Sequence, residues 1–290
     1  MRSSSQTAHQ RIISLAPSVT SILLALGARR QLVAVSKWCK DVADVNGLPE
    51  LGDCWALSGN TASDNARLGG ARSGDVAALL KLKPTLIIGS VPFKTETVQE
   101  ILKLPVPFLA LNPRRLADVE MDIRTLGLLA NAKSRAETLI GEMRRRFESV
   151  RKIADRAKSR LRVYCEAWPN PRISSPPWVA ELVEICGGKM PVTAGARISD
   201  EEVARTNPEI IVLAWTAVGG KSKPEQALNN PAWSNVRAVR EKKVFVIRDE
   251  LLNTPGPPLM RGAEELLRVI HPELAGAKQS HRNSAKAAAT

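Results

Sequence analysis

The chain has 290 residues and a mass of 31.5 kDa, a length that suits one large domain or two lobes. Hydrophobic residues make up 44% and charged residues 24%, which excludes a disordered chain, a collagen and a coiled coil. No apolar run is long enough for a transmembrane helix, and four cysteines are too few for a disulfide scaffold. The net charge of +13 fits an anionic partner or a solvated basic surface, but no nucleic-acid recognition motif accompanies it.

The first 115 residues alternate short apolar runs with helical patterns. Ser18 is a candidate N-cap for the first helix, and Lys37–Arg72 is irregular, with a flexible excursion over Ser58–Gly74. Such alternation predicts a parallel sheet with helices on both faces. Strands are predicted at Arg11–Ala16, Leu32–Ser36, Thr85–Gly89 and Val106–Leu111, and helices at Val19–Leu26, Asp75–Leu82 and Thr95–Lys103.

A long helical pattern follows from Leu116 to about Ser159, with a break at Asn131–Lys133. Its second part, Ser134–Ser159, would span about 39 Å and carries one apolar stripe on an otherwise polar rod. The densest basic segment of the chain, Arg144–Arg162, begins within this helix. We expect the helix to bridge two lobes.

The alternation then restarts and predicts a second α/β lobe. Strands are predicted at Arg162–Ala167, Ile210–Ala214 and Val244–Arg248, and helices at Trp178–Cys186, Asp200–Arg205, Pro224–Glu241 and Gly262–Ile270. The predicted organisation is an N-terminal lobe over 11–133, a bridging helix over 134–160, a C-terminal lobe over 161–275 and a disordered tail over 276–290. The fold class is α/β, with a mainly parallel sheet flanked by helices in each lobe.

The tryptophans indicate where a ligand binds. Trp38, Trp168 and Trp215 each follow a predicted strand, and Trp55 lies in the irregular segment after the second strand. Ligands of open α/β sheets bind beyond the carboxyl ends of the strands. The pattern favours a cleft lined by these four flat rings, which suits a large, flat, partly apolar ligand. The alternative is that the rings cap the sheets or pack the contact between the lobes.

Thiols and charged residues near the same edges admit further interpretations. Cys39, Cys54 and Glu166 could hold a metal, Cys39 and Cys54 could form a redox disulfide, or the thiols could be small buried side chains. Arg248 and Glu250 follow the last strand, where Arg248 pairs either with an anionic group of the ligand or in a structural salt bridge. No positioned nucleophile and base indicate an enzyme, so we expect none; a corrinoid-processing enzyme is the weaker alternative.

Several segments carry a family resemblance. RIISLAPSVTSILLALG, LVAVS, LPELGDCW and LLKLKPTLIIG in the first lobe, with WVAELVEICGG, SDEEVARTNPEIIVLAW and VFVIRDE in the second, resemble the helical-backbone (class III) periplasmic binding proteins. The resemblance covers about residues 11–272 and is strongest to the cobalamin-binding members that serve ABC importers. It implies two α/β lobes bridged by one long helix, with the ligand held between the lobes.

The resemblance also implies roles for individual residues. Trp55 matches a tryptophan that packs against the corrin, and Pro17 and Ser18 match the first ligand-facing loop. Glu201 matches a carboxylate that docks on the membrane permease. The matching first-lobe docking position holds Ala77, with Asp75 as the nearest acid. Cys186 matches a disulfide-bonded cysteine, whose partner is missing from the last helix here.

The function expected from these observations is that of a ligand-binding protein for cobalamin or another corrinoid. No cofactor is required, and whether a metal is bound stays open; the alternative function is a binder of metals or metal chelates such as haem or a siderophore. An ABC permease is the expected partner if the docking position at Ala77 is tolerated. No export signal is recognised, which predicts a cytoplasmic location as the chain stands, or a periplasmic one if a signal was trimmed.

Overall fold

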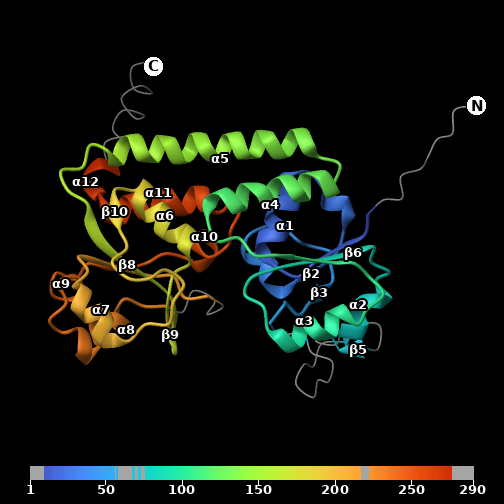
Figure 1. Ribbon diagram of the computed structural model, residues 1–290, viewed down its shortest axis with the longest axis horizontal. Coiled ribbons are helices and arrows are strands. Elements are labelled where there is room, and N and C mark those ends of the chain that lie inside the picture. Colours follow the sequence, from blue (N-terminus) through green and yellow to red (C-terminus); the bar gives the residue numbers. More distant parts are fainter. Residues whose placement is uncertain are drawn as a thin grey trace, which may run out of the picture. The chain divides into compact units, whose positions relative to one another are not determined.

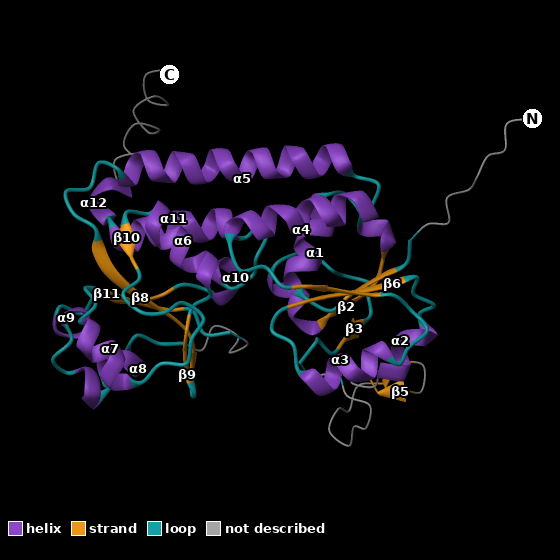
Figure 2. Ribbon diagram, in the orientation of Figure 1, coloured by secondary structure: helices purple, strands orange, loops and turns teal. Residues whose placement is uncertain are grey.

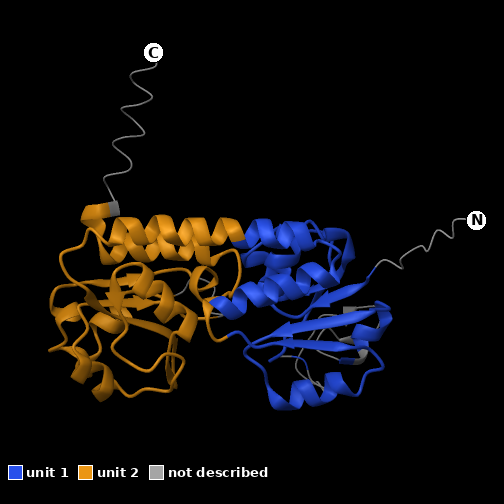
Figure 3. Cartoon of the chain, turned by 45° about the horizontal axis from the view of Figure 1, so that its top comes forward, with its two compact units in different colours: residues 1–113, 117–140 blue, residues 114–116, 141–290 orange. Residues whose placement is uncertain are grey.

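The computed structural model describes residues 10–55, 57, 67–68, 71–72, 76–216 and 222–275 (Figure 1). The chain divides into two compact units, shown in different colours in Figure 3. Unit 1 comprises residues 1–113 and 117–140, and unit 2 comprises residues 114–116 and 141–290. The predicted tail over 276–290 lies outside the described residues.

Unit 1 contains a sheet of five parallel strands in the order β3-β2-β1-β6-β7. The strands are short and nearly all apolar, as expected for strands covered on both faces. Their bounds are β1 Ile12–Ser14, β2 Leu32–Ser36, β3 Glu50–Leu51, β6 Leu86–Ser90 and β7 Phe108–Leu111; a separate antiparallel pair is formed by β4 Arg67–Leu68 and β5 Ala71–Arg72.

Helices cover both faces of this sheet. Figure 2 shows α1 and α4 on one face and α2 and α3 on the other. On the second face, Leu79 of α2 and Ile101 of α3 pack against Ile13, Ala34 and Ile87 of the strands. The helices are α1 Pro17–Ala25, α2 Val76–Lys81, α3 Thr95–Leu102 and α4 Leu116–Leu129, with short 3₁₀ turns η1 Arg29–Gln31 and η2 Lys37–Asp41.

The start of α1 corrects one expectation. Ser18 is not the N-cap; the helix begins at Pro17, and Ala16 occupies the cap position without a side-chain hydrogen bond. Proline suits the first helical position because the amide hydrogen that it lacks would have no partner inside the helix.

The helix α5, Lys133–Ala154, begins in unit 1 and ends in unit 2. The predicted break before it is confirmed, because α4 ends at Leu129 and Asn131 adopts a left-handed conformation (φ +55°). The helix ends five residues before the predicted Ser159, in turns over 155–157. Since the unit boundary falls after Ile140, α5 is shared by both units rather than forming a separate segment over 134–160.

Unit 2 contains four parallel strands in the order β10-β8-β11-β12, and β9 adds an antiparallel hairpin to β8. The two short strands β9 and β10 were not predicted, because their sequences lack an apolar run. The bounds are β8 Leu161–Pro169, β9 Arg172–Ser174, β10 Gly188–Lys189, β11 Ile210–Leu213 and β12 Val244–Val246.

Helices α6 and α11 cover one face of this sheet, and α7, α8 and α9 cover the other (Figure 1). The segment Pro224–Glu241 is mainly helical, as predicted, but the helix is not continuous. It is three short pieces, because Pro231 lacks an amide hydrogen and the Asn230 side chain caps a new turn. The helices are α6 Pro177–Ile185, α7 Asp200–Thr206, α8 Glu225–Leu228, η3 Pro231–Trp233, α9 Arg237–Arg240, α10 Asp249–Leu252, α11 Leu259–Ile270 and α12 Pro272–Ala275. Among the described residues, no helix combines the length and the apolar character that crossing a bilayer requires.

Candidate functional site

All five strands of the unit 1 sheet end at one edge, since they run in parallel. Three of them end in a serine that is buried, namely Ser14, Ser36 and Ser90. The loops that continue from this edge carry Pro17, Trp38 and Trp55. The structure therefore brings the expected ligand-facing residues of the first lobe to the carboxyl edge of one sheet.

A buried polar cluster fixes two of these loops. Thr20 Oγ1 in α1 lies 2.7 Å from Ser14 Oγ and 3.0 Å from Cys39 Sγ. Ser36 Oγ lies 3.3 Å from the same sulfur. These contacts tie the first turns of α1 to η2, the turn that carries Trp38, and so limit the movement of both.

Trp55 stands on a loop that is anchored on both sides. Its backbone amide donates to Asp53 Oδ1 (2.9 Å), and the preceding carbonyl of Cys54 accepts from the amide of Lys94 (3.1 Å). Thr97 Oγ1 donates to the carbonyl of Leu57 at 2.5 Å. Trp55 itself is 59% exposed. The protein holds the loop firmly while leaving a large apolar side chain in water.

The other predicted contacts of unit 1 are less exposed. Trp38 is half-buried, and Lys37 Nζ lies 4.9 Å from the centroid of its ring, a cation–π geometry. Pro17 is half-buried and Ser18 is buried. Of the described aromatic residues expected to face a ligand, this edge therefore carries Trp38 and Trp55.

The thiols of unit 1 are core side chains. Cys39 and Cys54 are both buried and free, so the Cys39–Cys54 disulfide is not formed. Cys54 packs against Gly89, where an added Cβ would lie 2.3 Å from its sulfur. Burial, and then the charge of Asp53, raise the pKa of Cys54 to about 12; burial raises the pKa of Cys39 as well. Neutral buried thiols are poor metal ligands.

At the matching edge of unit 2, the fully buried carboxylate of Glu166 accepts three hydrogen bonds. Oε1 accepts from Trp215 Nε1 and Oε2 from the hydroxyl of Tyr164, each at 2.8 Å, and Arg172 Nη1 also donates to Oε2. Burial raises the pKa of Glu166, while Arg172, Tyr164 and Trp215 act in the opposite direction. Both oxygens are thus already used inside the protein.

Arg172 extends this network beyond the carboxylate. Its Nη2 lies 2.9 Å from Asp200 Oδ1 at the start of α7, and its guanidinium lies over the ring of Trp233 at 4.3 Å. Tyr164 meets the same ring edge-on. We call the residues Tyr164, Glu166, Arg172, Asp200, Trp215 and Trp233 the Glu166 network; they join β8, β9, α7 and η3.

These contacts correct two expectations. Trp215 is only 8% exposed and Glu166 is not exposed at all, so neither offers surface to a ligand. The expected metal ligands Cys39, Cys54 and Glu166 are all buried, and Glu166 already accepts hydrogen bonds from three protein donors. No group of three or more potential ligands for a metal lies together in the described part of the chain.

The β8–β9 hairpin carries the remaining aromatic ring of this edge. Trp168 is half-buried, and its Nε1 donates to the carbonyl of Asn170 at 2.8 Å. Arg248 forms a salt bridge with Glu250 (Nε–Oε1 2.8 Å). Of the two roles considered for this arginine, the structure thus contains the salt bridge. The Arg248 side chain remains 59% exposed and can still contact an anionic group.

Glu201 lies in the first turn of α7, on the surface of unit 2. The predicted cap is confirmed, since Ser199 Oγ accepts from the amide of Glu202 at 3.1 Å. The backbone amide of Glu201 and the Ser199 hydroxyl lower the pKa of Glu201, which keeps the carboxylate ionised. Asp75 and the side chain of Ala77 lie outside the described residues.

Sequence reasoning missed Arg172 and Tyr164. Arg172 lies in a turn-rich segment, PNPR, and Tyr164 reads as one more apolar strand residue. One signal was present: an acid two residues after Tyr164 in a buried strand requires donors. The sequence did not indicate which of the 42 basic residues supplies the charge.

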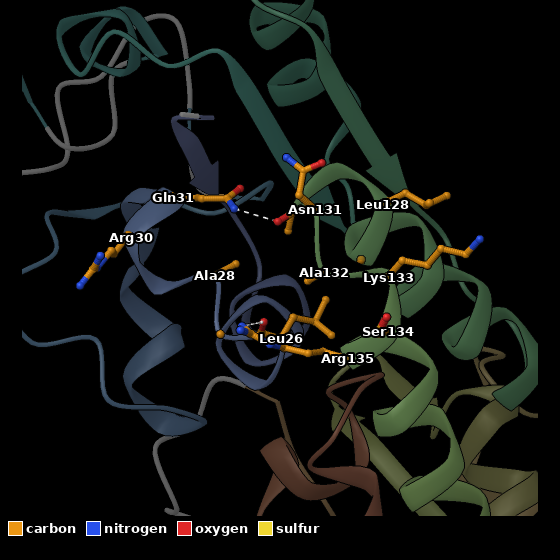
Figure 4. A pocket seen from close by; sticks show the side chains of 13 residues that line it. Leu26, Ala28, Arg30, Gln31, Leu128, Asn131, Ala132, Lys133, Ser134 and Arg135 are labelled. Atoms are coloured by element: carbon orange, nitrogen blue, oxygen red, sulfur yellow. Dashed lines mark hydrogen bonds between the residues drawn. The ribbon is translucent and has the colours of Figure 1, made fainter. Parts of the chain in front are cut away.

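A hollow of about 590 Å³ in unit 1 lies away from the carboxyl edge, between the end of α1 and the α4–α5 turn (Figure 4). Small residues line it, including Gly27 and Ala132. Arg135 is held by the carbonyl of Leu26 (2.8 Å), and Figure 4 shows Arg30 and Lys133 pointing away from each other. Its polar groups do not converge on a common point.

The parallel sheets of the two units and the long helix α5 define the class of protein: the fold is that of the helical-backbone periplasmic binding proteins. The family model described as "Periplasmic binding protein" matches residues 12–251. The chain therefore belongs to the periplasmic binding protein family, whose members bind substrates and are not enzymes.

Curated relatives agree over nearly the whole chain. The uncharacterized ABC transporter substrate-binding lipoprotein YvrC of Bacillus subtilis is 24% identical over 91% of this chain and 81% of its own length. The vitamin B12-binding protein of Pectobacterium carotovorum is 22% identical over 93% of this chain and 92% of its own length.

Solved structures show the same fold. The periplasmic heme-binding protein RhuT from Roseiflexus matches with a TM-score of 0.73 at 20% identity, over 92% of this chain and 99% of that one. The periplasmic vitamin B12 binding protein BtuF of Vibrio cholerae matches with a TM-score of 0.67 at 19% identity, over 92% of this chain and 98% of that one.

Proposed function

We propose that the protein is the substrate-binding component of an ABC importer and that its ligand is a corrinoid, such as cobalamin. Trp55 and Trp38 at the carboxyl edge of unit 1 form the primary contact. Trp168 at the edge of unit 2 is the second expected contact. The relatives named as vitamin B12-binding proteins support the ligand class.

The observation that carries this proposal is the exposure of Trp55. A tryptophan that is 59% exposed leaves costly apolar surface in water, and the hydrogen bonds around Asp53 and Thr97 hold its loop in place. A flat ligand that covers the ring gains the burial of this surface without ordering the loop first.

The choice between a corrinoid and haem rests on axial ligands. Haem iron in proteins takes a histidine, tyrosine, cysteine or methionine side chain. Of the described candidates, His271, Tyr164, Met143 and all four cysteines are buried, and Met190 and Met260 are half-buried. Met121 is exposed, but it stands on α4 and not on the loops that carry Trp38 and Trp55. A corrinoid brings its own axial ligands and needs only an apolar wall, which favours it over haem.

The proposed permease contact uses the exposed carboxylate of Glu201. The carboxylate is ionised and lies at the amino end of α7, where it can meet a basic side chain of a membrane partner. Because Arg172 and Asp200 join α7 to the β8–β9 hairpin, this carboxylate stands on the same rigid part of unit 2 as Trp168.

Isothermal titration with cyanocobalamin, with hemin in parallel, tests the proposal. We expect Trp55→Ala to weaken cyanocobalamin binding by about 2 kcal/mol, a roughly 30-fold rise in Kd, because the contact area of one indole is lost. Trp38→Ala and Trp168→Ala show whether the other two rings take part.

Leu102→Ala is the matched control, because Leu102 is 65% exposed at the far end of α3 in the same unit. It should leave Kd unchanged. Binding of hemin but not of cyanocobalamin would reject the corrinoid in favour of haem, and equal effects of Trp55→Ala and Leu102→Ala would reject the site.

A further inference from the structure

The second half of α5 and the residues that follow it up to Arg162 concentrate the positive charge of the protein. Between Arg144 and Arg162 there are nine Lys and Arg residues and two acidic residues, which accounts for more than half of the net charge of +13. All of these residues belong to unit 2. The segment is thus one continuous basic feature of a single compact unit.

The buried side of this helix segment is well defined. Met143, Val150 and Ala154 are buried, and Arg146 on the same side reaches Glu264 of α11 at 2.6 Å. Figures 1 and 3 show this part of α5 running along the border of unit 2, with α11 on its inner side. The packed face of α5 is therefore accounted for by the protein itself.

The opposite side carries a row of cations. At about 100° per residue, Arg145 and Lys152 of α5 fall within about 20° of one another and about 180° from the buried side chains, and Arg156 follows in the turn directly after the helix. All three are exposed. The basic chain continues past the helix end into Lys158 and Arg160.

Most of this row is not neutralised within the described part of the chain. The side chains of Arg145, Arg156, Lys158 and Arg160 form no hydrogen bond or ion pair with the described residues. Lys152 lies 3.8 Å from Glu148, a pair that is exposed to solvent on both sides and contributes little. The row can therefore exchange its water and counterions for an external anionic partner.

We propose that the outer face of α5 (Arg145 and Lys152), continued past the helix end by Arg156, Lys158 and Arg160, adsorbs to an anionic phospholipid surface. Cations on long aliphatic stems along a straight helix match a flat array of headgroup phosphates. No aromatic side chain lies among these five residues, so the row lacks the aromatic platforms on which single-strand nucleic-acid sites stack bases. The inference goes beyond the proposed function, because no bound ligand takes part in it.

Vesicle co-sedimentation of the full chain tests this proposal. Vesicles of phosphatidylcholine with about 30 mol% phosphatidylglycerol should bind the protein at about 50 mM KCl and release it at about 500 mM. Vesicles of phosphatidylcholine alone should not bind it. The triple variant Arg145→Gln/Lys152→Gln/Arg156→Gln should lower the partition coefficient at least about tenfold.

The matched control removes three exposed cations elsewhere, in Arg30→Gln/Lys133→Gln/Arg240→Gln. It should lower partitioning by less than about threefold. An equal loss in both triple variants would overturn the proposal, since net charge alone would then explain adsorption. Binding to poly(U) RNA without binding to the anionic vesicles would also overturn it. Circular dichroism and cyanocobalamin titration of both variants keep a folding defect or a failed ligand assignment apart from the outcome.

Discussion

At the scale of single residues, the Glu166 network buries a carboxylate that needs several hydrogen-bond donors. A buried carboxylate costs several kcal/mol unless donors replace the water that it loses. Here Trp215, Tyr164 and Arg172 supply these donors, and the Arg172 guanidinium in turn lies on Trp233. The charge pair stabilises the unit only as a complete set.

Removing one partner should expose this dependence. We expect Arg172→Met to lower the free energy of unfolding by about 3 kcal/mol in urea titration, because it leaves Glu166 buried without its cation. The variant Arg172→Met/Glu166→Gln should recover part of the loss. Arg268→Met, which breaks an exposed pair with Glu265, should cost less than about 1 kcal/mol.

The loss in Arg172→Met should also depend on pH. Burial already raises the pKa of Glu166, and the variant removes a group that lowers it. The folded state then binds more protons than the unfolded state above the unfolded pKa of the carboxyl group, so stability falls as pH rises. The defect should be larger at pH 8 than at pH 5, and a pH-independent defect would contradict this account.

At the scale of elements, glycines decide how closely helices approach their neighbours. In α11, a Cβ on Gly262 would lie 2.1 Å from the carbonyl oxygen of Leu251, so α10 packs backbone to backbone against this helix. In α5, a Cβ on Gly141 would meet only the flexible end of Arg145, at 3.4 Å. Two helical glycines thus have opposite structural roles.

The two alanine substitutions should have opposite signs. Gly262→Ala should destabilise the protein by about 3 kcal/mol, because α10 and α11 must move apart. Gly141→Ala should stabilise it by about 0.5–1 kcal/mol, because alanine is the better helix former and fits the space. Thermal unfolding of both variants measures this, and shifts in the same direction would refute the packing argument.

At the scale of the whole molecule, the question is which parts respond to the ligand. Ligand that binds only the folded state adds about 2.7 kcal/mol of stability at 100 times Kd. The candidate contacts lie on a few loops: residues 36–55 in unit 1 and the β8–β9 hairpin in unit 2. The rest of each unit is a scaffold whose exchange with solvent should not change locally.

Hydrogen exchange can therefore map the binding surface. With saturating cyanocobalamin, amides over residues 36–55 should exchange more slowly, because the ligand covers Trp38 and Trp55. Amides of the β8–β9 hairpin should slow as well if Trp168 takes part, while α12 serves as the internal control. Saturation without any slowing over 36–55 would place the ligand elsewhere on the protein.

Local sequence determined most of the elements of this protein. Short apolar runs bounded by Pro, Gly and Asn predicted seven strands of the two parallel sheets, and the stripe of Leu139, Met143 and Val150 predicted α5. The cap at Ser199 was predicted as well. These features depend on residues within one or two turns of each other, so the sequence contains the whole cause.

Tertiary structure decided which polar and aromatic residues face water. Trp55 and Trp215 both follow strand segments and look alike in sequence, yet one is 59% exposed and the other 8%. Glu166 became an internal acceptor because Arg172 and Trp215, the latter 49 residues away, converge on it. Such long-range convergence has no local pattern, because burial depends on how separate elements pack and not on the residues beside each side chain.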